Sequence, residues 1–287
     1  MSVSNLSVGF RTLEVPDSKI QDINCDDKVR VDKRLSLYPN MYVELRSTEV
    51  EKNTALAKIS KDGEWIEKIT AQTVNGLTAR NREQVFALDA LMNDDIPVVV
   101  LTGSAGTGKT ICTLATAMQK IQDKKYQRCI VTSPMSQVTK YSFGALPGGI
   151  DEKFNPYLAN YMTNLEQFTN SRGNVEHMVE QYRIEAIPLQ FFRGASFNKC
   201  FIIADEMQVC NHMEILTVGT RVGEGSKIVI MGDLYQRDEN IAKEKTGLYK
   251  LMNDKKIKES GLVATICLQK CERSAVANLF SEVFEEK

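Results

Sequence analysis

Apolar and polar residues alternate in short runs over roughly the first 75 residues. Met41–Arg46 reads as a strand that follows the turn-forming pair Pro39-Asn40. Asp62-Gly63 separates two further runs, Ala55–Ile59 and Trp65–Ile69, and this arrangement is typical of a β-hairpin. We therefore predict a small β-rich subdomain over residues 1–75.

From residue 81 onward, helical periodicity alternates with short apolar runs. A predicted helix over Asn81–Met92 leads to a strand at Pro97–Thr102 and then to a glycine-rich loop. The next helix repeats apolar residues at the helical period, at Ile111, Leu114, Ala115, Met118 and Ile121. Four later runs have the length of strands: Cys129–Thr132, Phe201–Ala204, Lys227–Met231 and Val263–Cys267.

Nearly continuous apolar strands separated by helices indicate a mostly parallel sheet that is covered on both faces. The pattern ends on a predicted helix with one apolar stripe, at Val276, Leu279, Phe280, Val283 and Phe284. We expect residues 76–287 to form this α/β domain, which the β-rich subdomain precedes.

The glycine-rich loop carries the strongest chemical signal in the chain. It fits the pattern G-x-x-x-x-G-K-[ST] and lies between an apolar strand and an amphipathic helix, as a phosphate-binding loop requires. Its residues are Gly103, Ser104, Ala105, Gly106, Thr107, Gly108, Lys109 and Thr110. Backbone N–H groups and the following helix N-terminus would hold phosphate oxygens. Lys109 would reach the β- and γ-phosphates of ATP, and the Thr110 hydroxyl would bind Mg²⁺.

Two further strands end in polar residues. Phe201–Ala204 is followed by Asp205 and Glu206, at the end of the strand where ligands of open α/β sheets bind. We assign Asp205 to Mg²⁺, directly or through water, and Glu206 to orienting or deprotonating the attacking water. The strand Lys227–Met231 is followed by Gly-Asp-x-x-Gln, which resembles the motif that superfamily 1 and 2 helicases use to sense the γ-phosphate. This resemblance implies that Gln236 binds that phosphate or the attacking water, and the alternative is an exposed polar side chain in a turn.

Gln84 has two interpretations that remain open. Asn81 with Gln84 three residues later fits a helix capping box. The Gln84 amide is also suited to hydrogen bonding with adenine, as a comparable glutamine does in helicases.

Composition narrows the class of protein. The 287 residues include 43% hydrophobic and 25% charged residues, so an ordinary globular core is expected. The formal net charge of −1 disfavours a generally basic nucleic-acid binder, although a local basic channel stays open. The seven cysteines include no Cys-x-x-Cys pair, and neither a signal peptide nor a membrane span is visible. We expect a cytoplasmic protein with reduced thiols.

Taken together, these segments resemble the PhoH-like ATPase family over residues 81–284. The resemblance rests on segments that occur in the family's order: Asn81–Gln84, Ala87–Asp89, the phosphate loop, Ile130–Pro134, Asp205–Gln208, Thr220-Arg221 and Gly232-Asp233. It also rests on two less common signatures, Leu146–Gly148 with Asp151–Lys153 and Asn155–Tyr157 after it, and Phe192–Gly194. It implies a RecA-like P-loop NTPase core that hydrolyses ATP and is linked to RNA metabolism. The stretch Leu37–Asn40 resembles the connecting segment of proteins that join a PIN nuclease to such an ATPase.

The resemblance also bears on particular residues. The roughly 75 residues before the core are too few for a nuclease domain and the β-rich subdomain together, so nuclease activity is not carried over from the resemblance. Ser133 stands where the family often has Arg, so no phosphate or RNA contact is assigned to this position. Arg193, Arg221 and Arg273 match family positions. Arg273 is the preferred arginine finger, and Arg221 is the alternative. The structural alternative for Arg273 is a salt bridge at the start of the last helix.

Three functions follow as hypotheses. The first is an ATP-driven enzyme that remodels RNA or another single-stranded nucleic acid. It would act as a homo-oligomer, such as a ring, because one motor domain alone does not make a monomeric helicase. The second is a slow nucleotide switch acting on a protein partner, and the weakest is a small-molecule kinase. For nucleic-acid contact we single out Lys140, Tyr141, Phe143, Lys153, Phe154, Tyr157 and Tyr161. The alternative is that these aromatic residues pack a helix against the core.

Overall fold

The computed structural model describes residues 10–134, 161–169, 172–236, 242–270 and 283. The chain divides into two compact units, one formed by residues 1–73, 78–108 and 251–287, and the other by residues 74–77 and 109–250. Within the described part of the chain, no helix has the length and apolar character needed to cross a membrane.

A five-stranded sheet occupies the N-terminal part of the first unit, with the strand order β1-β3-β4-β5-β2. β1 (Phe10–Val15) pairs in parallel with β3 (Tyr42–Ser47), and the other neighbours are antiparallel: β4 (Thr54–Ile59), β5 (Trp65–Lys68) and β2 (Lys28–Arg30). The predicted hairpin is confirmed as β4–β5, with Gly63 at φ 77° in its turn. A β-rich region therefore precedes the α/β core.

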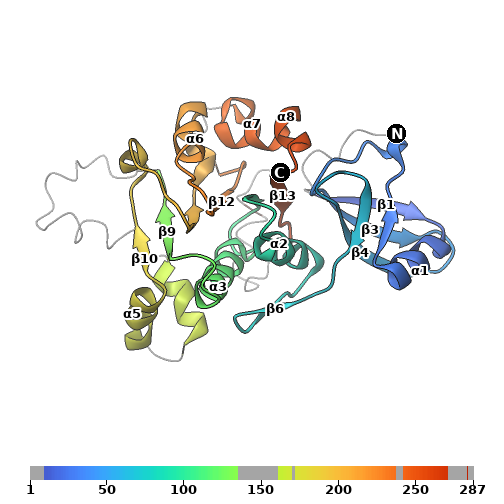
Figure 1. The fold of residues 1–287 in the computed structure, drawn as a ribbon, viewed down its shortest axis with the longest axis horizontal. Helices are drawn as coiled ribbons and strands as arrows, with labels where there is room; N and C mark the ends of the chain where they lie inside the picture. The colour runs from blue at the N-terminus through green and yellow to red at the C-terminus, as the bar shows by residue number, and fades with distance from the viewer. Residues whose placement is uncertain (1–9, 135–160, 170–171, 237–241, 271–282, 284–287) are drawn as a thin grey trace, which may run out of the picture. The chain divides into compact units, whose positions relative to one another are not determined.

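One helix in this region was not predicted. α1 (Asp17–Asp26) lies on the sheet in Figure 1 and contacts β3 and β4. It buries Ile20 and Ile23, which pack in a core with Val43 and Ile59. Two apolar residues at one helical spacing are too weak a periodic signal to stand out among the surrounding strand-like runs.

The second sheet is α/β in character and has the order β10-β9-β11-β12-β8-β13. Its strands are β8 (Val98–Thr102), β9 (Arg128–Thr132), β10 (Ile184–Ala186), β11 (Cys200–Ala204), β12 (Lys227–Gly232) and β13 (Val263–Cys267). Each registered pair in it is parallel. The predicted parallel sheet is thus confirmed, with β10 as a short edge strand that the apolar pattern did not reveal.

Helices alternate with these strands. The principal ones are α2 (Arg82–Met92), α3 (Lys109–Gln122), α5 (Arg172–Gln181), α6 (His212–Gly219), α7 (Gly247–Asn253) and α8 (Lys255–Glu259). Short 3-10 helices occur in both regions of the chain. η1 (Lys33–Leu35) lies between β2 and β3, and the others follow β9: η3 (Glu166–Phe168), η4 (Leu189–Phe192), η5 (Met207–Val209) and η6 (Lys243–Lys245). The predicted C-terminal helix lies outside the described residues, apart from position 283.

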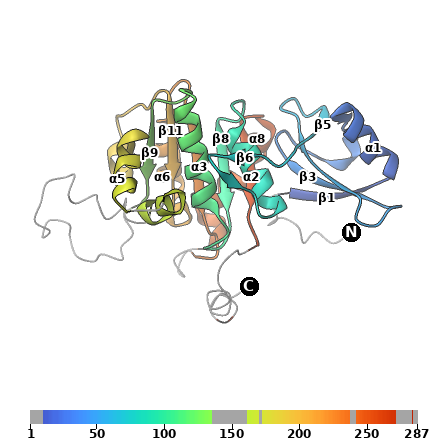
Figure 2. The ribbon, with the colours of Figure 1, turned by 90° about the horizontal axis from the view of Figure 1, so that it is seen from below.

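α3 is buried more completely than its predicted stripe implies. Figure 2 shows α3 beside β9, which it contacts. Leu114, Ala115 and Met118 are buried as expected, but Thr113 and Thr116 are buried as well. The hydroxyls of these two threonines donate to the carbonyls of Lys109 (2.8 Å) and Cys112 (3.0 Å), one turn back. Because each hydroxyl is hydrogen-bonded within the helix, polar residues at these positions do not indicate a solvent-exposed face.

Candidate functional site

The loop between β8 and α3 has a backbone that only glycine adopts easily. Gly103, Gly106 and Gly108 have φ values of 144°, 81° and 98°. A Cβ atom at Gly103 would lie 2.1 Å from the carbonyl oxygen of Leu268, and Leu268 N in turn donates to Thr102 O at 2.7 Å. The loop therefore lies directly against the chain that follows β13, with no room for a side chain at Gly103.

Thr107 and Gln84 hold the loop in place. Thr107 is fully buried, and its hydroxyl donates to Ser104 O at 2.9 Å. The Gln84 side chain donates to Thr107 O at 3.1 Å and accepts from Arg80 N at 2.9 Å. Asn81 caps α2 by accepting from Gln84 N at 3.0 Å. One hydrogen bond of the predicted capping box is thus present, from Gln84 N to Asn81, while the Gln84 side chain accepts from Arg80 N where a capping box would have Asn81 N. Gln84 also connects the start of α2 to the loop.

Glu83 plays a role that the sequence pattern did not indicate. It is buried, and its Oε2 accepts from the backbone N–H groups of Gln269 (2.7 Å) and Lys270 (3.0 Å). These partners lie 186 and 187 residues away in the chain. Glu83 and Leu268 together place the segment after β13 against the start of α2 and the phosphate loop.

Asp205 and Glu206 follow β11, as predicted. Asp205 N donates to Thr132 O at 2.9 Å, which continues the β9–β11 register, and Asp205 Oδ1 accepts from Glu206 N at 2.9 Å. Glu206 has φ 57°, a left-handed conformation that is costly for a residue with a Cβ. Strained residues of this kind cluster at functional sites. The turn exposes the Glu206 side chain, while Asp205 is half-buried.

The charge on Asp205 is set by competing effects. Burial raises the pKa of its carboxyl above the ordinary 3.8, and the negative charge of Glu206 adds to this. Hydrogen bonds from Glu206 N and the Tyr161 hydroxyl act in the opposite direction, as does the positive charge of Lys109. A positive charge near a half-buried carboxylate favours the ionised form that a metal ion needs.

Tyr161 contacts Asp205 directly. Its hydroxyl donates to Asp205 Oδ2 at 3.0 Å, and the side chain is buried. Burial raises the pKa of the phenol, and the negative charge of Asp205 adds to this. The burial of Tyr161 agrees with the packing interpretation of the aromatic residues. Sequence reasoning did not anticipate its contact with Asp205.

Gln208 links the turn after β11 to the turn after β12. This buried side chain donates to Glu206 Oε2 at 2.7 Å and to Gln236 O at 3.3 Å, and it accepts from Asp233 N at 3.1 Å. A Cβ atom at Gly232 would lie 2.7 Å from Gln208 Oε1, so the glycine makes room for the bridge. Gln208 occurs in the segment Asp205–Gln208 that carried the family resemblance, yet sequence alone assigned it no role.

Arg221 is placed away from Asp205 in the same chain. Val222 forms a parallel bridge with Phe197, and both residues precede the strands β12 and β11. Asp205 lies beyond the other end of β11, whose five residues span roughly 16 Å. Arg221 donates to Ala195 O at 3.5 Å, and its buried Nε atom has no partner among the described residues. Within one chain, the structure does not bring Arg221 and Asp205 together.

Other predicted residues lie outside the described part of the chain. These are Arg273, Lys140, Tyr141, Phe143, Lys153, Phe154 and Tyr157. Gln236 is described: it is exposed beside the Gln208 bridge, and its N–H donates to Asp233 O at 3.0 Å.

The residues at the two motifs fit a nucleotide and a hard divalent cation. Glycine backbones in the left-handed region let a loop wrap closely around phosphate oxygens. Thr110 offers a hydroxyl and Asp205 a carboxylate, the oxygen ligands that Mg²⁺ takes together with phosphates. Chemically, this arrangement is suited to positioning a phosphate chain beside Glu206.

Comparisons with known proteins agree with the motifs. The family described as PhoH-like protein matches residues 76–285. The protein PhoH2 of Bacillus subtilis (strain 168) is 30% identical over 286 residues, which are 96% of this chain and 64% of that protein. Protein PhoH2 of Mycolicibacterium smegmatis is 34% identical over 214 residues, 74% of this chain and 48% of that protein. The chain thus spans less than two thirds of the length of either relative.

Two solved structures share distant similarity with the chain. A Pif1 helicase from Candida albicans has a TM-score of 0.37 at 15% identity, over 72% of this chain and 43% of that one. The SWI2/SNF2 ATPase core of Sulfolobus solfataricus in complex with dsDNA has a TM-score of 0.38 at 14% identity, over 69% and 45%. At these scores neither structure informs the site. The family match, together with the relatives that share it, shows that this chain belongs to the PhoH family.

Proposed function

We propose that this protein binds ATP with Mg²⁺ and hydrolyses it. The observation that carries the proposal is the backbone of the phosphate loop, where Gly103, Gly106 and Gly108 have φ values of 144°, 81° and 98°. The positive charge of Lys109, which follows this loop, also lowers the pKa of Asp205, the carboxylate expected on the metal. Phosphoryl transfer depends chiefly on such positioning and on charge stabilisation.

Each residue then has a defined task. The backbone of Gly103–Gly108 and the Lys109 ammonium group hold the phosphates, and Thr110 and Asp205 hold the cation. The bound Mg²⁺ supplies charge neutralisation at the phosphates. Glu206 orients the attacking water and accepts its proton, while Gln208 fixes the Glu206 carboxylate at 2.7 Å. Gln236 senses the γ-phosphate. The Gln84 amide donates one of its two hydrogens to Thr107 O, and its second hydrogen contacts adenine.

We further propose that hydrolysis drives remodelling of RNA, or of another single-stranded nucleic acid, by a homo-oligomer. Family membership supports this. Because Arg221 lies beyond the opposite end of β11 from Asp205, it would serve as an arginine finger only toward a neighbouring subunit. Arg273 remains the preferred finger on sequence grounds. We take residues 1–75 as the β-rich subdomain and residues 76–287 as the ATPase domain.

The variant Glu206→Gln tests catalysis. It keeps the size of the side chain and removes the base, so hydrolysis should fall at least ~100-fold while ATP affinity stays near that of the wild type. Steady-state phosphate release and binding of a fluorescent ATP analogue measure the two quantities. Glu180→Gln, on the exposed end of α5, is the matched control and should leave both unchanged.

Unchanged turnover in Glu206→Gln would remove Glu206 from catalysis.

Lys109→Ala should weaken nucleotide binding, and wild-type affinity in that variant would overturn the phosphate-loop assignment.

Adding single-stranded RNA or DNA to the wild-type protein tests whether nucleic acid is coupled to ATP hydrolysis. A rate that neither nucleic acid raises would favour the slow nucleotide switch over the remodelling enzyme.

A further inference from the structure

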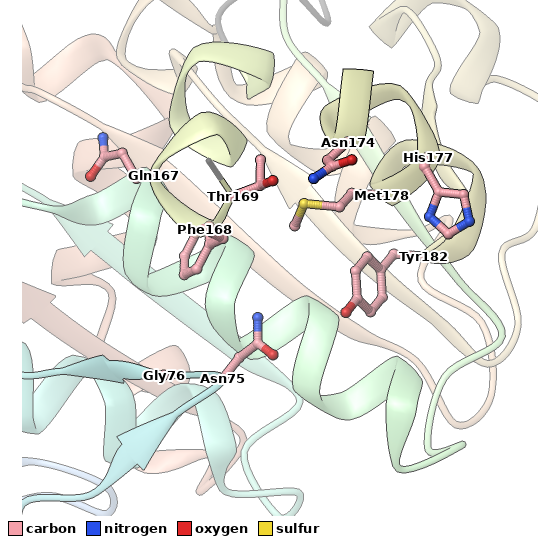
Figure 3. Close-up of a pocket in the computed structure, with 9 residues that line it drawn as sticks. All are labelled: Asn75, Gly76, Gln167, Phe168, Thr169, Asn174, His177, Met178 and Tyr182. Carbon is pink, nitrogen blue, oxygen red and sulfur yellow. The ribbon is translucent and has the colours of Figure 1, made fainter. Parts of the chain in front are cut away.

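A polar cavity lies in the second unit, away from the residues just discussed. Its volume is about 510 Å³, and Figure 3 shows its lining residues converging from three elements. The tip of the hairpin formed by β6 (Thr73–Val74) and β7 (Leu77–Thr78) supplies Asn75 and Gly76. The segment that includes η3 supplies Gln167, Phe168 and Thr169. The helix α5 supplies Asn174, His177 and Met178, and Tyr182 directly follows this helix.

The lining has a distinctive chemistry. It carries no Lys, Arg, Asp or Glu side chain, but it combines aromatic rings and a thioether with three carboxamide side chains. The carboxamide groups of Gln167 and Asn174 and the His177 ring make no hydrogen bond in the part of the chain that the structure describes, and Asn174 and His177 are exposed. These donors and acceptors are therefore available to a ligand.

The cavity rests on a fixed support. Asn75 and Gly76 have φ values of 46° and 80°, the two left-handed residues of a tight hairpin turn. Asn75 N donates to Gln119 Oε1 on α3 at 3.3 Å. The Tyr182 hydroxyl accepts from Gln122 Nε2, also on α3, at 2.7 Å. Both ends of the cavity are thus anchored to the last turns of α3, so its wall is formed before any ligand arrives.

We propose that this cavity binds one unpaired nucleobase. A base has a π-face, which suits the half-buried ring of Phe168, and an edge of hydrogen-bond donors and acceptors, which suits carboxamides. The buried ring of Tyr182 forms part of the wall. A phosphate group would find no cation in the lining, and a metal ion would find no carboxylate. A purely apolar ligand would leave the carboxamide groups unpaired. The volume falls within the range of roughly 300–1,000 Å³ that is usual for small-ligand sites.

The biological role of this cavity rests on the proposed function, because a nucleobase site would serve the remodelling of single-stranded nucleic acid. The cavity is distinct from the phosphate loop. Gln119 follows Lys109 by ten residues on the same helix, which corresponds to roughly 15 Å along the axis. A base held here would therefore bind at the opposite end of α3 from the nucleotide phosphates. The neutral lining favours a base of a single strand, whose charged backbone stays in solvent, over a free nucleotide.

The test measures binding of labelled single-stranded RNA and DNA of about 16 nucleotides by fluorescence anisotropy. Phe168→Ala should weaken binding by about tenfold, the scale of losing one stacked base. The paired variant Gln167→Ala, Asn174→Ala changes exposed side chains only and should weaken it in the same direction. The slope of affinity against salt concentration should stay that of the wild type, because no phosphate contact is lost. Gln181→Ala on α5 is the matched control, and basal ATPase and thermal stability should not change in any of these variants.

Free nucleoside monophosphates form a second arm, followed by equilibrium dialysis. Binding that Phe168→Ala removes, without a change in strand affinity, would support a nucleobase site filled by free nucleotide. The site is overturned if the wild type and the cavity variants bind single strands with equal affinity and also bind free nucleotides with equal affinity. If the wild type binds no strand, the nucleic-acid part of the proposed function fails, and free-nucleotide binding still decides the cavity.

Discussion

At the scale of single residues, Gln208 shows how one neutral side chain organises several charged and polar groups. Its amide group is the right length and polarity to donate to Glu206 and the Gln236 carbonyl while accepting from Asp233 N. A carboxylate in its place would retain the acceptor but would repel Glu206. The strained turn at Glu206 and the exposed turn at Gln236 therefore share one support.

Gln208→Met keeps a similar volume and removes all three hydrogen bonds. Leaving the buried Asp233 N–H without its partner should cost about 1–3 kcal/mol of unfolding free energy. With Glu206 released, kcat should fall by about tenfold or more, while the affinity for ATP changes little. Chemical denaturation, ATP titration and steady-state kinetics measure the three quantities.

Gln181→Met, an exposed substitution of the same kind, serves as the control for Gln208→Met. A loss of ATP affinity as large as the loss of kcat would contradict a positioning role, because it would mean that the whole site is disordered.

At the scale of elements, the strand–loop–helix unit of β8 and α3 depends on a backbone path that no other residue type allows. Gly103 combines φ 144° with the close approach of the Leu268 carbonyl. Gly219, the last residue of α6, has open space where an added Cβ atom would lie. The two glycines therefore respond differently to the same small substitution.

Gly103→Ala should lower nucleotide affinity by at least ~10-fold, or ~1.4 kcal/mol, because the new methyl group displaces the loop from Leu268. Gly219→Ala should leave affinity unchanged and should keep or raise the melting temperature, since alanine favours helix over glycine by up to about 1 kcal/mol. Isothermal titration and thermal unfolding measure both variants. Wild-type affinity in Gly103→Ala would show that the loop is not in its binding conformation here.

At the scale of the whole molecule, the N-terminal sheet is joined to α2 within the first unit. The buried ring of Phe86 lies 5.4 Å from Phe10 and 5.1 Å from Tyr42, measured between ring centroids. The Tyr42 hydroxyl donates to Asp89 at 2.7 Å, and Arg82 pairs with the buried Glu44 at 2.9 Å. Apolar and polar contacts together make the sheet and α2 one packed body.

Phe86→Ala should lower the free energy of unfolding by about 3–5 kcal/mol, the usual cost of deleting a buried aromatic ring. Hydrogen exchange should show β3 and α2 losing protection together, because the same ring supports both. Phe191→Ala removes a ring that is 57% exposed and should change stability by no more than ~0.5 kcal/mol. Loss of protection in α2 alone would mean that the N-terminal sheet folds independently.

Local sequence patterns predicted much of the fold. The β4–β5 hairpin, α2, α3 and the strands β8, β9, β11, β12 and β13 all occur close to their predicted bounds. Each depends on a contiguous run: a turn pair, a helical period or an apolar stretch. α1 and β10 were missed because their apolar signals are short, and α3 is more buried than predicted because its threonines bond within the helix.

Sequence by itself determined the phosphate loop motif, the Asp205-Glu206 pair and the family, since these are short motifs in a fixed order. The tertiary structure decided which distant groups meet. Glu83 reaches Gln269 across 186 residues, Tyr161 reaches Asp205, and Gln208 joins two turns. It also placed Arg221 at the opposite end of β11 from Asp205 and assembled the cavity from three separate segments. Such contacts depend on how strands are ordered and how helices pack, and no periodicity along one segment encodes that order.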